Sequence, residues 1–277
     1  MRRACIIGWP IEHSRSPAIH RYWLKVYGID GDYEKEAVRP EELAGFLRSL
    51  AERGYSGANV TLPHKEEALR LAFIADEAAR AIGAANTVWR DGAGRLNASN
   101  TDAYGFMTNL NQEAPHWNKG RRPVMVLGAG GAARAIVYGL TTQGASRILL
   151  ANRTRDRAEA LAGAFGPTVG VVDWEGRNQA LAGCGLLVNA TSLGMTGKEP
   201  LDIDVEDLPE DALVADIVYS PLETPLLASA RARGRQTVDG LGMLLYQAVP
   251  GFERWFGMRP EVTKELRAHV ASTLGGV

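Results

Sequence analysis

Several side chains that could take part in chemistry lie in one short segment, GANVTLPHKEE at Gly57 to Glu67. Its first half is typical of a buried strand, yet Asn59 and Thr61 occupy positions where apolar side chains would be easier to bury. Successive side chains alternate across a strand, so these two point to the same side and could bind a ligand with several hydroxyls or a carboxylate. Alternatively, they satisfy the backbone of a neighbouring loop, and the residues alone do not decide between these interpretations.

Lys65 stands in the first turn of the helix expected after this strand. A cation there opposes the helix dipole at a cost of ~0.3 to 1 kcal/mol, which favours a functional reason for its presence. Asp102, in the motif NTD, starts another predicted helix and by itself is typical of an N-cap. If the fold brings it beside Lys65, the two form an acid–base pair that can move a proton while a hydride moves elsewhere. The alternative is a surface lysine whose charge is eased by Glu66 and Glu67.

Two more polar groups occur in the first half of the chain. Ser14 and Ser16 alternate in HSRSP, and Ser16 before Pro17 is typical of an N-cap followed by proline at the first helical position. Hydroxyls at a helix N-terminus also suit a carboxylate, so both roles can coexist. Asn86 and Asn100 flank a predicted hairpin around the turn DGAG, which would place them close together at one sheet edge.

A glycine-rich turn carries the chemistry of the second half. In VMVLGAGGAAR, a buried strand leads through Gly128, Gly130 and Gly131 into a helix. Such a turn lets backbone amides approach a pyrophosphate, which the helix dipole then stabilises. Ala133 replaces the third glycine of the usual pattern. A plain strand-to-helix turn would have similar glycines, but a further strand follows directly and favours a dinucleotide site.

The end of that next strand distinguishes between cofactors. An acidic residue there usually holds the ribose of NAD, whereas arginine accommodates the 2′-phosphate of NADP. The chain has NRTRDR, with Asn152, Arg153, Thr154 and Arg157 but no acid at the strand end. Asp156 is expected in the first turn of the following helix. We therefore predict NADP, with a solvated charged surface as the alternative.

These residues must be positioned by an α/β architecture, because β-rich runs alternate with helical patterns along most of the chain. In the first part we expect strands at 4–9, 32–38 and 56–62, helices at 17–28, 40–54, 63–73 and 75–83, and a hairpin of 85–90 with 95–100. A helix should begin near Asp102, and the polar stretch 111–123 is a candidate domain boundary. Six more strands are expected at 124–129, 147–153, 169–173, 185–191, 213–219 and 235–240, as in a doubly wound sheet, followed by helical segments at 242–257 and 260–275.

Composition limits the classes of partner. The 277 residues include 31 basic and 32 acidic side chains without a long run of one sign, which argues against nucleic acid and anionic membranes and favours a small molecule. Cys5 and Cys184 have no nearby ligands at metal-binding spacing, so we expect two buried thiols in a reducing compartment and no metal site. No apolar stretch approaches the roughly 20 residues of a membrane span, and we expect a cytoplasmic protein.

Matched motifs in the same order give the chain a resemblance to the shikimate dehydrogenase family, from Ile7 to about Ala248. They are GWPIEHSRSP, NVTLPHK, NT at 86, NTD at 100, GAGGAAR, NRT, NATSLGM, DIVYSPLETPLL and DGLGMLLYQA. The resemblance implies an N-terminal α/β substrate domain with a mainly parallel sheet and a C-terminal Rossmann-type NADP-binding domain. We expect the substrate-binding catalytic domain at 1–104, completed by helices in 243–277, and the NADP-binding domain at 105–242.

The resemblance further implies NADPH-dependent reduction of 3-dehydroshikimate to shikimate, in chorismate and aromatic amino-acid biosynthesis, with the substrate in a cleft between two domains. Lys65 and Asp102 would be the catalytic pair. The substrate-binding residues would be Ser14, Ser16, Asn59, Thr61, Asn86, Tyr219 and Gln247. The pyrophosphate would lie on Gly128, Ala129, Gly130, Gly131 and Ala132, and the 2′-phosphate on Asn152, Arg153, Thr154 and Arg157. The ribose and nicotinamide would contact Thr191, Ser192, Met195, Gly240 and Met243.

Two alternatives stay open at this point. One is a related enzyme that uses quinate and shikimate more broadly, or that uses NAD. The other is a non-catalytic NADP- or metabolite-binding regulator, against which the presence of both Lys65 and Asp102 argues. The sequence does not distinguish a monomer from a homodimer, nor which member of the pair transfers the proton.

Overall fold

The computed structural model describes residues 1–274, which divide into two compact units. The first unit comprises Met1–Asp102 and the chain from Leu245 to the end of the described residues, and the second comprises Ala103–Leu244. The expected C-terminal segment 243–277 therefore has its last three residues outside the described part. The polar stretch 111–123 lies inside the second unit, so the boundary expected there is wrong.

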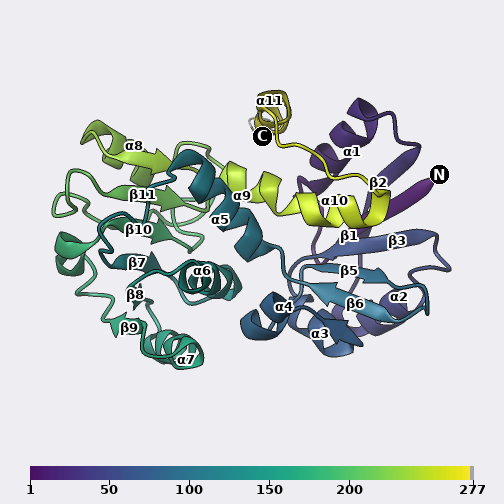
Figure 1. Ribbon diagram of the computed structural model, residues 1–277, viewed down its shortest axis with the longest axis horizontal. Coiled ribbons are helices and arrows are strands. Elements are labelled where there is room, and N and C mark those ends of the chain that lie inside the picture. Colours follow the sequence, from purple (N-terminus) through teal and green to yellow (C-terminus); the bar gives the residue numbers. More distant parts are fainter. Residues whose placement is uncertain (275–277) are drawn as a thin grey trace. The chain divides into compact units, whose positions relative to one another are not determined.

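A six-stranded sheet forms the centre of the first unit, in the order β2-β1-β3-β5-β6-β4 (Figure 1). Its strands are β1 Arg2–Gly8, β2 Gly31–Ala37, β3 Tyr55–Val60, β4 Ile74–Ala75, β5 Thr87–Arg90 and β6 Leu96–Ser99. The β1–β2, β1–β3 and β4–β6 pairs are parallel, whereas β5 is antiparallel to both β3 and β6. The predicted hairpin is confirmed. As a consequence, the end of β3, the start of β5 and the end of β6 lie at the same sheet edge.

The helices of the first unit include two from the end of the chain. They are α1 Ser16–Val26, α2 Leu43–Arg48 after the 3₁₀ turn η1 Pro40–Glu42, α3 Lys65–Leu71, α4 Glu77–Ile82, α10 Ala248–Phe256 and α11 Lys264–Ser272. The helix expected at 40–54 ends early because the chain turns back towards β3, with Gly54 at a positive φ of 81°. The helix expected at 63–73 begins at Lys65, since a turn closed by the Thr61 carbonyl and the His64 amide comes first.

Helix α10 packs on the sheet of the first unit through a close approach at Gly57. A Cβ added to Gly57 would lie 2.0 Å from Nε1 of Trp255 and 2.4 Å from the carbonyl oxygen of Val88. The Trp255 indole donates to that same carbonyl at 3.2 Å. Glycine at this position in β3 therefore allows a helix from near the end of the chain to cover β1, β3 and β5.

The second unit contains a parallel six-stranded sheet in the order β12-β11-β10-β7-β8-β9. Its strands are β7 Val124–Leu127, β8 Ile148–Ala151, β9 Val169–Val172, β10 Leu186–Asn189, β11 Leu213–Asp216 and β12 Gln236–Val238. Its helical segments are α5 Asp102–Glu113, α6 Gly131–Thr142, α7 Arg155–Phe165, η2 Gln179–Gly183, α8 Pro225–Ala232 and α9 Gly240–Tyr246. The first residue of α5 and the last two residues of α9 belong to the first unit. This is the Rossmann strand order, in which ligands bind where the order reverses, between β7 and β10.

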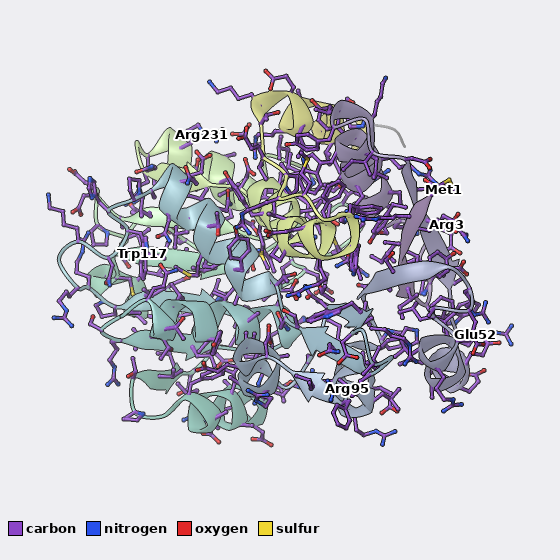
Figure 2. The ribbon with its side chains drawn as sticks, turned by 45° about the vertical axis from the view of Figure 1, so that its right-hand side comes forward. Met1, Arg3, Glu52, Arg95, Trp117 and Arg231 are labelled. Atoms are coloured by element: carbon purple, nitrogen blue, oxygen red, sulfur yellow. The ribbon has the colours of Figure 1, made fainter. Side chains whose placement is uncertain are left out.

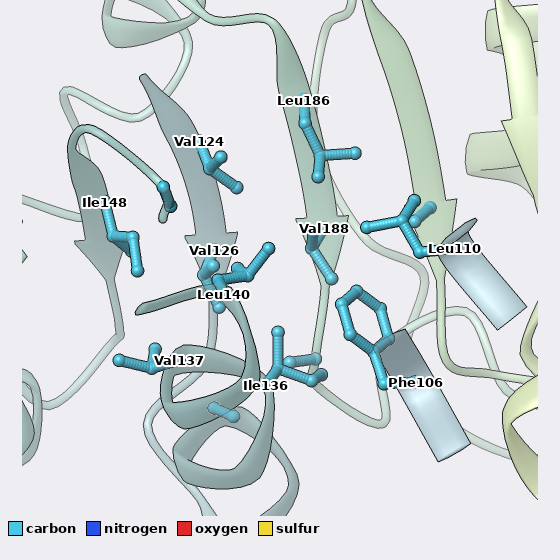
Figure 3. Close-up of a cluster of buried hydrophobic side chains, with 14 of the residues drawn as sticks. Phe106, Leu110, Val124, Val126, Ile136, Val137, Leu140, Ile148, Leu186 and Val188 are labelled. Atoms are coloured by element: carbon cyan, nitrogen blue, oxygen red, sulfur yellow. The ribbon is translucent and has the colours of Figure 1, made fainter. Parts of the chain in front are cut away.

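Both faces of this second sheet are buried. Figure 3 shows one core, where Val124 and Val126 of β7 and Val188 of β10 meet Ile136 of α6 and Phe106 of α5. The intervening residues of the same strands, including Met125 and Leu187, belong to a second apolar cluster on the opposite face. Burial on both faces is typical of a doubly wound sheet and holds the β7–α6 turn rigidly.

Figure 2 shows the side chains of both units as sticks, with nitrogen and oxygen atoms at many of their outer tips. The formal net charge of the chain is −1. Within residues 1–274, no helix has the length and apolar character to span a membrane. No cluster of His, Cys, Asp or Glu suited to a metal ion occurs in the same part of the chain.

Candidate active site

Lys65 and Asp102 form an ion pair in the first unit. The Lys65 Nζ lies 2.6 Å from Asp102 Oδ2, and the two side chains are 25% and 13% exposed. Each residue begins a helix, α3 and α5, and the Lys65 carbonyl is fixed by the Ala85 amide at 2.8 Å. Asp102 is the first residue of α5, and its carboxylate accepts from the Lys65 and Asn86 side chains. The Asn100 side chain accepts from the Asp102 backbone amide at 3.0 Å. The interpretation of Asp102 as an N-cap is therefore wrong.

Both members of this pair have spare hydrogen-bonding capacity, because each carboxylate oxygen can accept more than one hydrogen bond. Asp102 Oδ1 accepts from Asn86 Nδ2 at 2.8 Å, so both carboxylate oxygens already have donors. Lys65 donates one of its three hydrogens to Asp102 and keeps two for a ligand. The carboxylate also offsets the repulsion between the lysine and the positive end of α3, which explains why a cation is tolerated there.

Amide and hydroxyl side chains surround the pair at the common edge of β3, β5 and β6. The register places Asn59 opposite Thr87 and Thr87 opposite Ser99. Asn86 is buried just before β5, and its backbone amide donates to the Ser99 carbonyl at 3.0 Å. The expectation that Asn86 and Asn100 end neighbouring strands at one edge is confirmed. Asn59 is also buried, and its Nδ2 donates to the Asn86 carbonyl and to Thr87 Oγ1, at 3.2 Å each.

Thr61 and the two serines lie in the same unit, Thr61 directly after β3 and the serines at the start of α1. Thr61 follows β3, half-buried, with its amide bonded to the Ile7 carbonyl at 2.9 Å. Ser16 is the first residue of α1, and the capping position falls on Arg15, so the expected N-cap at Ser16 is wrong. Ser14 Oγ accepts instead from the Ser16 amide at 3.3 Å. A hydroxyl before the helix satisfies an amide that would otherwise lack a partner.

The last two predicted substrate-binding residues belong to different units. Gln247 lies half-buried at the start of α10, in the first unit. Tyr219 lies half-buried after β11, in the second unit. The structure therefore groups six of the seven predicted substrate residues in one unit and Tyr219 with the predicted cofactor residues.

In the second unit, the β7–α6 turn has the shape that a dinucleotide needs. Gly128 has a φ of 107°, and a Cβ there would lie 3.0 Å from Thr191 Cγ2, beyond the end of β10. This brings Gly128 and Thr191 together at the reversal of strand order. Gly130 and Gly131 are exposed and would have open space around an added Cβ. Their bare backbone leaves room for a pyrophosphate to approach.

Helix α6 begins at this turn without a side-chain cap. Gly130 occupies the capping position and makes no side-chain hydrogen bond, so the first amides of the helix are available to an anion. Ala129 and Ala132 are half-buried on either side. Ala133 is fully buried in the core between α6 and the sheet, which explains a small residue at the third position of the pattern.

Basic residues follow β8, where the 2′-phosphate was expected. Arg153 and Arg157 are exposed, and Asn152 Nδ2 donates to the Thr154 carbonyl at 2.8 Å to hold the loop. Asp156 lies in the first turn of α7, as predicted. The sequence analysis missed Glu199, whose Oε2 lies 3.4 Å from Arg153 Nη1 in an exposed pair. A weak pair of this kind leaves Arg153 free to exchange partners with a phosphate.

The loop after β10 carries Thr191, Ser192 and Met195 and is held by two buried residues that the sequence analysis also missed. Asn189 Nδ2 donates to Asp216 Oδ1 at 2.9 Å, and Asn189 Oδ1 accepts from the Thr191 amide and hydroxyl at 3.1 and 2.7 Å. Burial raises the pKa of Asp216 to about 6, against the opposing effect of its hydrogen bonds from Val218, Thr224 and Asn189. The NAT and DIVY motifs contained both residues, but only the fold shows that they meet.

Gly240 and Met243 lie on α9. A Cβ at Gly240 would approach the Ile217 carbonyl oxygen to 2.2 Å, so only glycine fits there. Met243 is half-buried against the core of the second unit. The predicted cofactor residues are thus all in the second unit, on the β7–α6 turn, the loops after β8 and β10, and α9.

The chain matches three family descriptions along its length. Residues 6–88 match the shikimate dehydrogenase substrate binding domain, residues 111–218 match shikimate/quinate 5-dehydrogenase, and residues 240–265 match the shikimate 5′-dehydrogenase C-terminal domain. A curated relative from Nitrobacter hamburgensis, shikimate dehydrogenase (NADP(+)), is 58% identical over 273 residues, covering 99% of this chain and 95% of the relative. The chain belongs to the shikimate dehydrogenase family. The predicted resemblance and fold class are confirmed.

Solved structures within and near the shikimate dehydrogenase family share the fold. Shikimate 5-dehydrogenase from Thermus thermophilus, in complex with NADP(H) and shikimate, has a TM-score of 0.87 at 36% identity, covering 99% of this chain and all of that one. Quinate dehydrogenase from Corynebacterium glutamicum, in complex with NAD, has a TM-score of 0.90 at 33% identity, covering 98% and 99%. The fold is therefore compatible with both substrates, and specificity must come from side chains.

Proposed function

We propose that this chain catalyses the reversible NADPH-dependent reduction of 3-dehydroshikimate to shikimate, in the pathway to chorismate and the aromatic amino acids. The observation that carries the proposal is the Lys65–Asp102 pair, 2.6 Å apart among amide and hydroxyl side chains in the first unit. A regulator that only binds its ligand has no need of such an acid–base pair. Curated relatives that are 54–58% identical to this chain carry the name shikimate dehydrogenase (NADP(+)).

The second unit fits NADPH, which supplies a hydride for the C3 carbonyl carbon when bound. Gly128, Gly130 and Gly131, with Ala129 and Ala132, would hold the pyrophosphate at the start of α6. Asn152, Arg153, Thr154 and Arg157 would hold the 2′-phosphate. Thr191, Ser192, Met195, Gly240 and Met243 would contact the ribose and nicotinamide.

In the reduction, Lys65 acts on the C3 oxygen of the substrate. As hydride forms the new C–H bond, the carbonyl π electrons move to this oxygen, and the ammonium group stabilises the developing charge. Lys65 then gives the oxygen a proton and completes the hydroxyl, and the reverse reaction returns that proton to Lys65. Asp102 holds the ammonium in place through its Oδ2, while Asn86 holds the other carboxylate oxygen.

The remaining residues of the first unit would hold the ring. Ser14 and Ser16, beside the start of α1, would bind the carboxylate. Thr61, Asn86 and Gln247 would position the ring hydroxyls, with Asn59 behind them. Tyr219 is also proposed as a substrate-binding residue. We further propose that residues 1–104 with 243–277 form the substrate domain and 105–242 the NADP-binding domain, and that the protein works in the cytoplasm as a monomer or homodimer.

The test is the loss of NADPH absorbance with purified protein and 3-dehydroshikimate, run beside NADH and 3-dehydroquinate. We expect rapid oxidation only where NADPH and 3-dehydroshikimate are combined. Activity with 3-dehydroquinate or NADH would support the broader quinate-using alternative instead. Protein that binds NADPH but oxidises it in no combination would support a non-catalytic regulator.

A further inference from the structure

Beneath the Lys65–Asp102 pair, a network of hydrogen bonds runs into the core of the first unit and reaches Tyr33, whose hydroxyl also interacts with the Ser16 side chain. Tyr33, in β2, is fully buried, and its hydroxyl donates to Asn59 Oδ1 at 2.6 Å. None of the roles assigned above uses this tyrosine. Buried polar side chains are normally hydrogen-bonded, and a fully satisfied buried network holds its members in one arrangement.

The hydrogen bonds between Tyr33 and Asn86 all run in one direction, which is set by the atoms that can donate. With Oδ1 of Asn59 facing Tyr33, its Nδ2 faces the Asn86 carbonyl and Thr87 Oγ1. Thr87 accepts from Asn59, so its own hydrogen goes to Asn86 Oδ1 at 3.0 Å. Thr101 adds two more donors to that oxygen, from its amide at 2.9 Å and its hydroxyl at 3.1 Å.

The result is a fixed Asn86 amide. Three donors hold its oxygen, so its Nδ2 must face Asp102 Oδ1, to which it donates at 2.8 Å. The other carboxylate oxygen of Asp102 then faces Lys65. Asn59, meanwhile, has both amide hydrogens committed to protein acceptors, which leaves it none for a substrate.

The Tyr33 ring is itself held firmly. It stacks on the buried His20 ring, with centroids 4.0 Å apart and planes 5° apart, and Trp255 lies against the same cluster. Neither His20 ring nitrogen makes a hydrogen bond of normal geometry to a described residue. The ring lies beside Asn59, whose side chain partly opposes the lowering of the His20 pKa by burial, and it contributes packing to the cluster. Burial raises the pKa of Tyr33 well above its usual value, which keeps the hydroxyl protonated and able to donate.

We infer that Tyr33 is a positioning residue for the Lys65–Asp102 pair and acts through Asn59 and Asn86. This inference rests on the proposed function. Loss of the Tyr33 hydroxyl would leave Asn59 Oδ1 buried without its donor. The side-chain amides of Asn59 and Asn86, which connect Tyr33 to Asp102, would then no longer be held in a single orientation. A small displacement of Asp102 and Lys65 slows proton transfer more than it weakens substrate binding.

The variant Tyr33→Phe removes the hydroxyl and keeps the stacked ring. We expect kcat for 3-dehydroshikimate to fall about tenfold while KM stays within about threefold. Tyr55→Phe is the matched control, because Tyr55 is a buried tyrosine in the same sheet whose hydroxyl contacts Glu34 and Glu36 instead. We expect its kcat to stay within about twofold of wild type.

A double-mutant cycle separates positioning from general destabilisation. In an Asp102→Asn background, Tyr33→Phe should change kcat by less than about twofold, since the group it positions has already been altered. An undiminished tenfold effect in that background, or a kcat for Tyr33→Phe equal to that of Tyr55→Phe, would overturn the inference. If Tyr33→Phe does not fold, Asn59→Ser interrupts the same chain and is judged by the same criteria. Wild-type protein that is inactive with 3-dehydroshikimate would contradict the proposed function rather than this inference.

Discussion

Arg153 is the single side chain that we propose selects NADPH over NADH. It follows β8 with no carboxylate at the strand end, and its only carboxylate partner within residues 1–274 is Glu199, at 3.4 Å across an exposed pair. Solvent-exposed pairs of this kind contribute at most about 1 kcal/mol. A 2′-phosphate offers a stronger, charge-assisted partner, so NADPH can displace Glu199.

Arg153→Ala should therefore weaken NADPH binding by about 10- to 100-fold, the usual value of a charge-assisted hydrogen bond. NADH lacks the 2′-phosphate, and its dissociation constant should change by less than about twofold. Titration of intrinsic fluorescence with each cofactor measures both constants. The control is Arg155→Ala, because Arg155 is also exposed but already pairs with Glu159 and Asp173. Equal weakening of NADPH and NADH in Arg153→Ala would rule out a phosphate contact.

The sequence identified individual residues best where a side chain conflicts with its position. Lys65 at the start of a helix and polar Asn59 in a buried strand were both conspicuous for that reason. Tyr33, Asn189 and Asp216 were missed, because an aromatic residue in a strand or a polar residue at a strand end has nothing unusual about it. Their roles depend on partners 26 or 27 residues away in the chain, which only the fold brings together.

At the level of elements, the loop after β10 depends on its connection to β11. Asp216, at the end of β11, is 2% exposed and holds Asn189 at the end of β10. Its second oxygen accepts from Thr224, which caps α8. Two strand ends and one helix start therefore share a single carboxylate, so a change at Asp216 should alter the loop after β10.

Asp216 should also give stability a characteristic dependence on pH. Its pKa is raised by burial from 3.8 to about 6, so the folded state holds this proton more tightly than the unfolded state. The resulting stabilisation is full below about pH 4 and is lost as the pH rises through about 6. Asp216→Asn keeps the size of the side chain but does not titrate. The free energy of unfolding of wild type relative to this variant should therefore increase, on the order of 2 kcal/mol, from pH 7.5 to pH 4.5. Urea unfolding at both pH values measures this difference, and a constant difference would contradict the assignment.

The types of the elements were predictable because the helical and the strand periodicity of apolar residues are both strong in this chain. The buried runs of β7, β8, β10 and β11 and the hairpin of β5 with β6 were expected from their apolar pattern and turns. Helix limits were less predictable. The segment 40–54 has a continuous helical pattern, but the chain must reverse at Gly54 to enter β3, and tertiary structure shortens the helix to Leu43–Arg48.

For the molecule as a whole, the first unit is discontinuous in sequence. Helix α11 returns to α1, where the Trp23 indole donates to the Glu261 carbonyl at 2.9 Å and the Glu261 amide donates to Tyr27 Oη at 3.0 Å. Leu266 and Val270 of α11 are fully buried. The sequence showed two helical segments at the end of the chain but did not assign them to a domain without the resemblance.

Leu266→Ala should therefore destabilise the protein although it lies over 160 residues from Lys65 and Asp102 in the chain. The expected loss is about 2 to 5 kcal/mol, the usual range for removing a buried leucine side chain. Thermal unfolding measures it, with Ala268→Ser on the exposed side of α11 as the control. NADPH affinity at 15 °C should be unchanged, because its proposed residues lie in the second unit. A melting temperature equal to that of wild type would show that α11 is not part of the folded first unit.

The turnover of Lys65→Ala with NADPH and 3-dehydroshikimate tests the proposed mechanism most directly. Removing the group that protonates the substrate oxygen should lower kcat by about 10²-fold or more, in keeping with typical acid–base contributions, with little loss of NADPH affinity. Lys25→Ala, an exposed lysine on α1, should retain wild-type turnover as the control. A Lys65→Ala variant that turns over as fast as wild type would contradict the assignment of Lys65 and with it the mechanism.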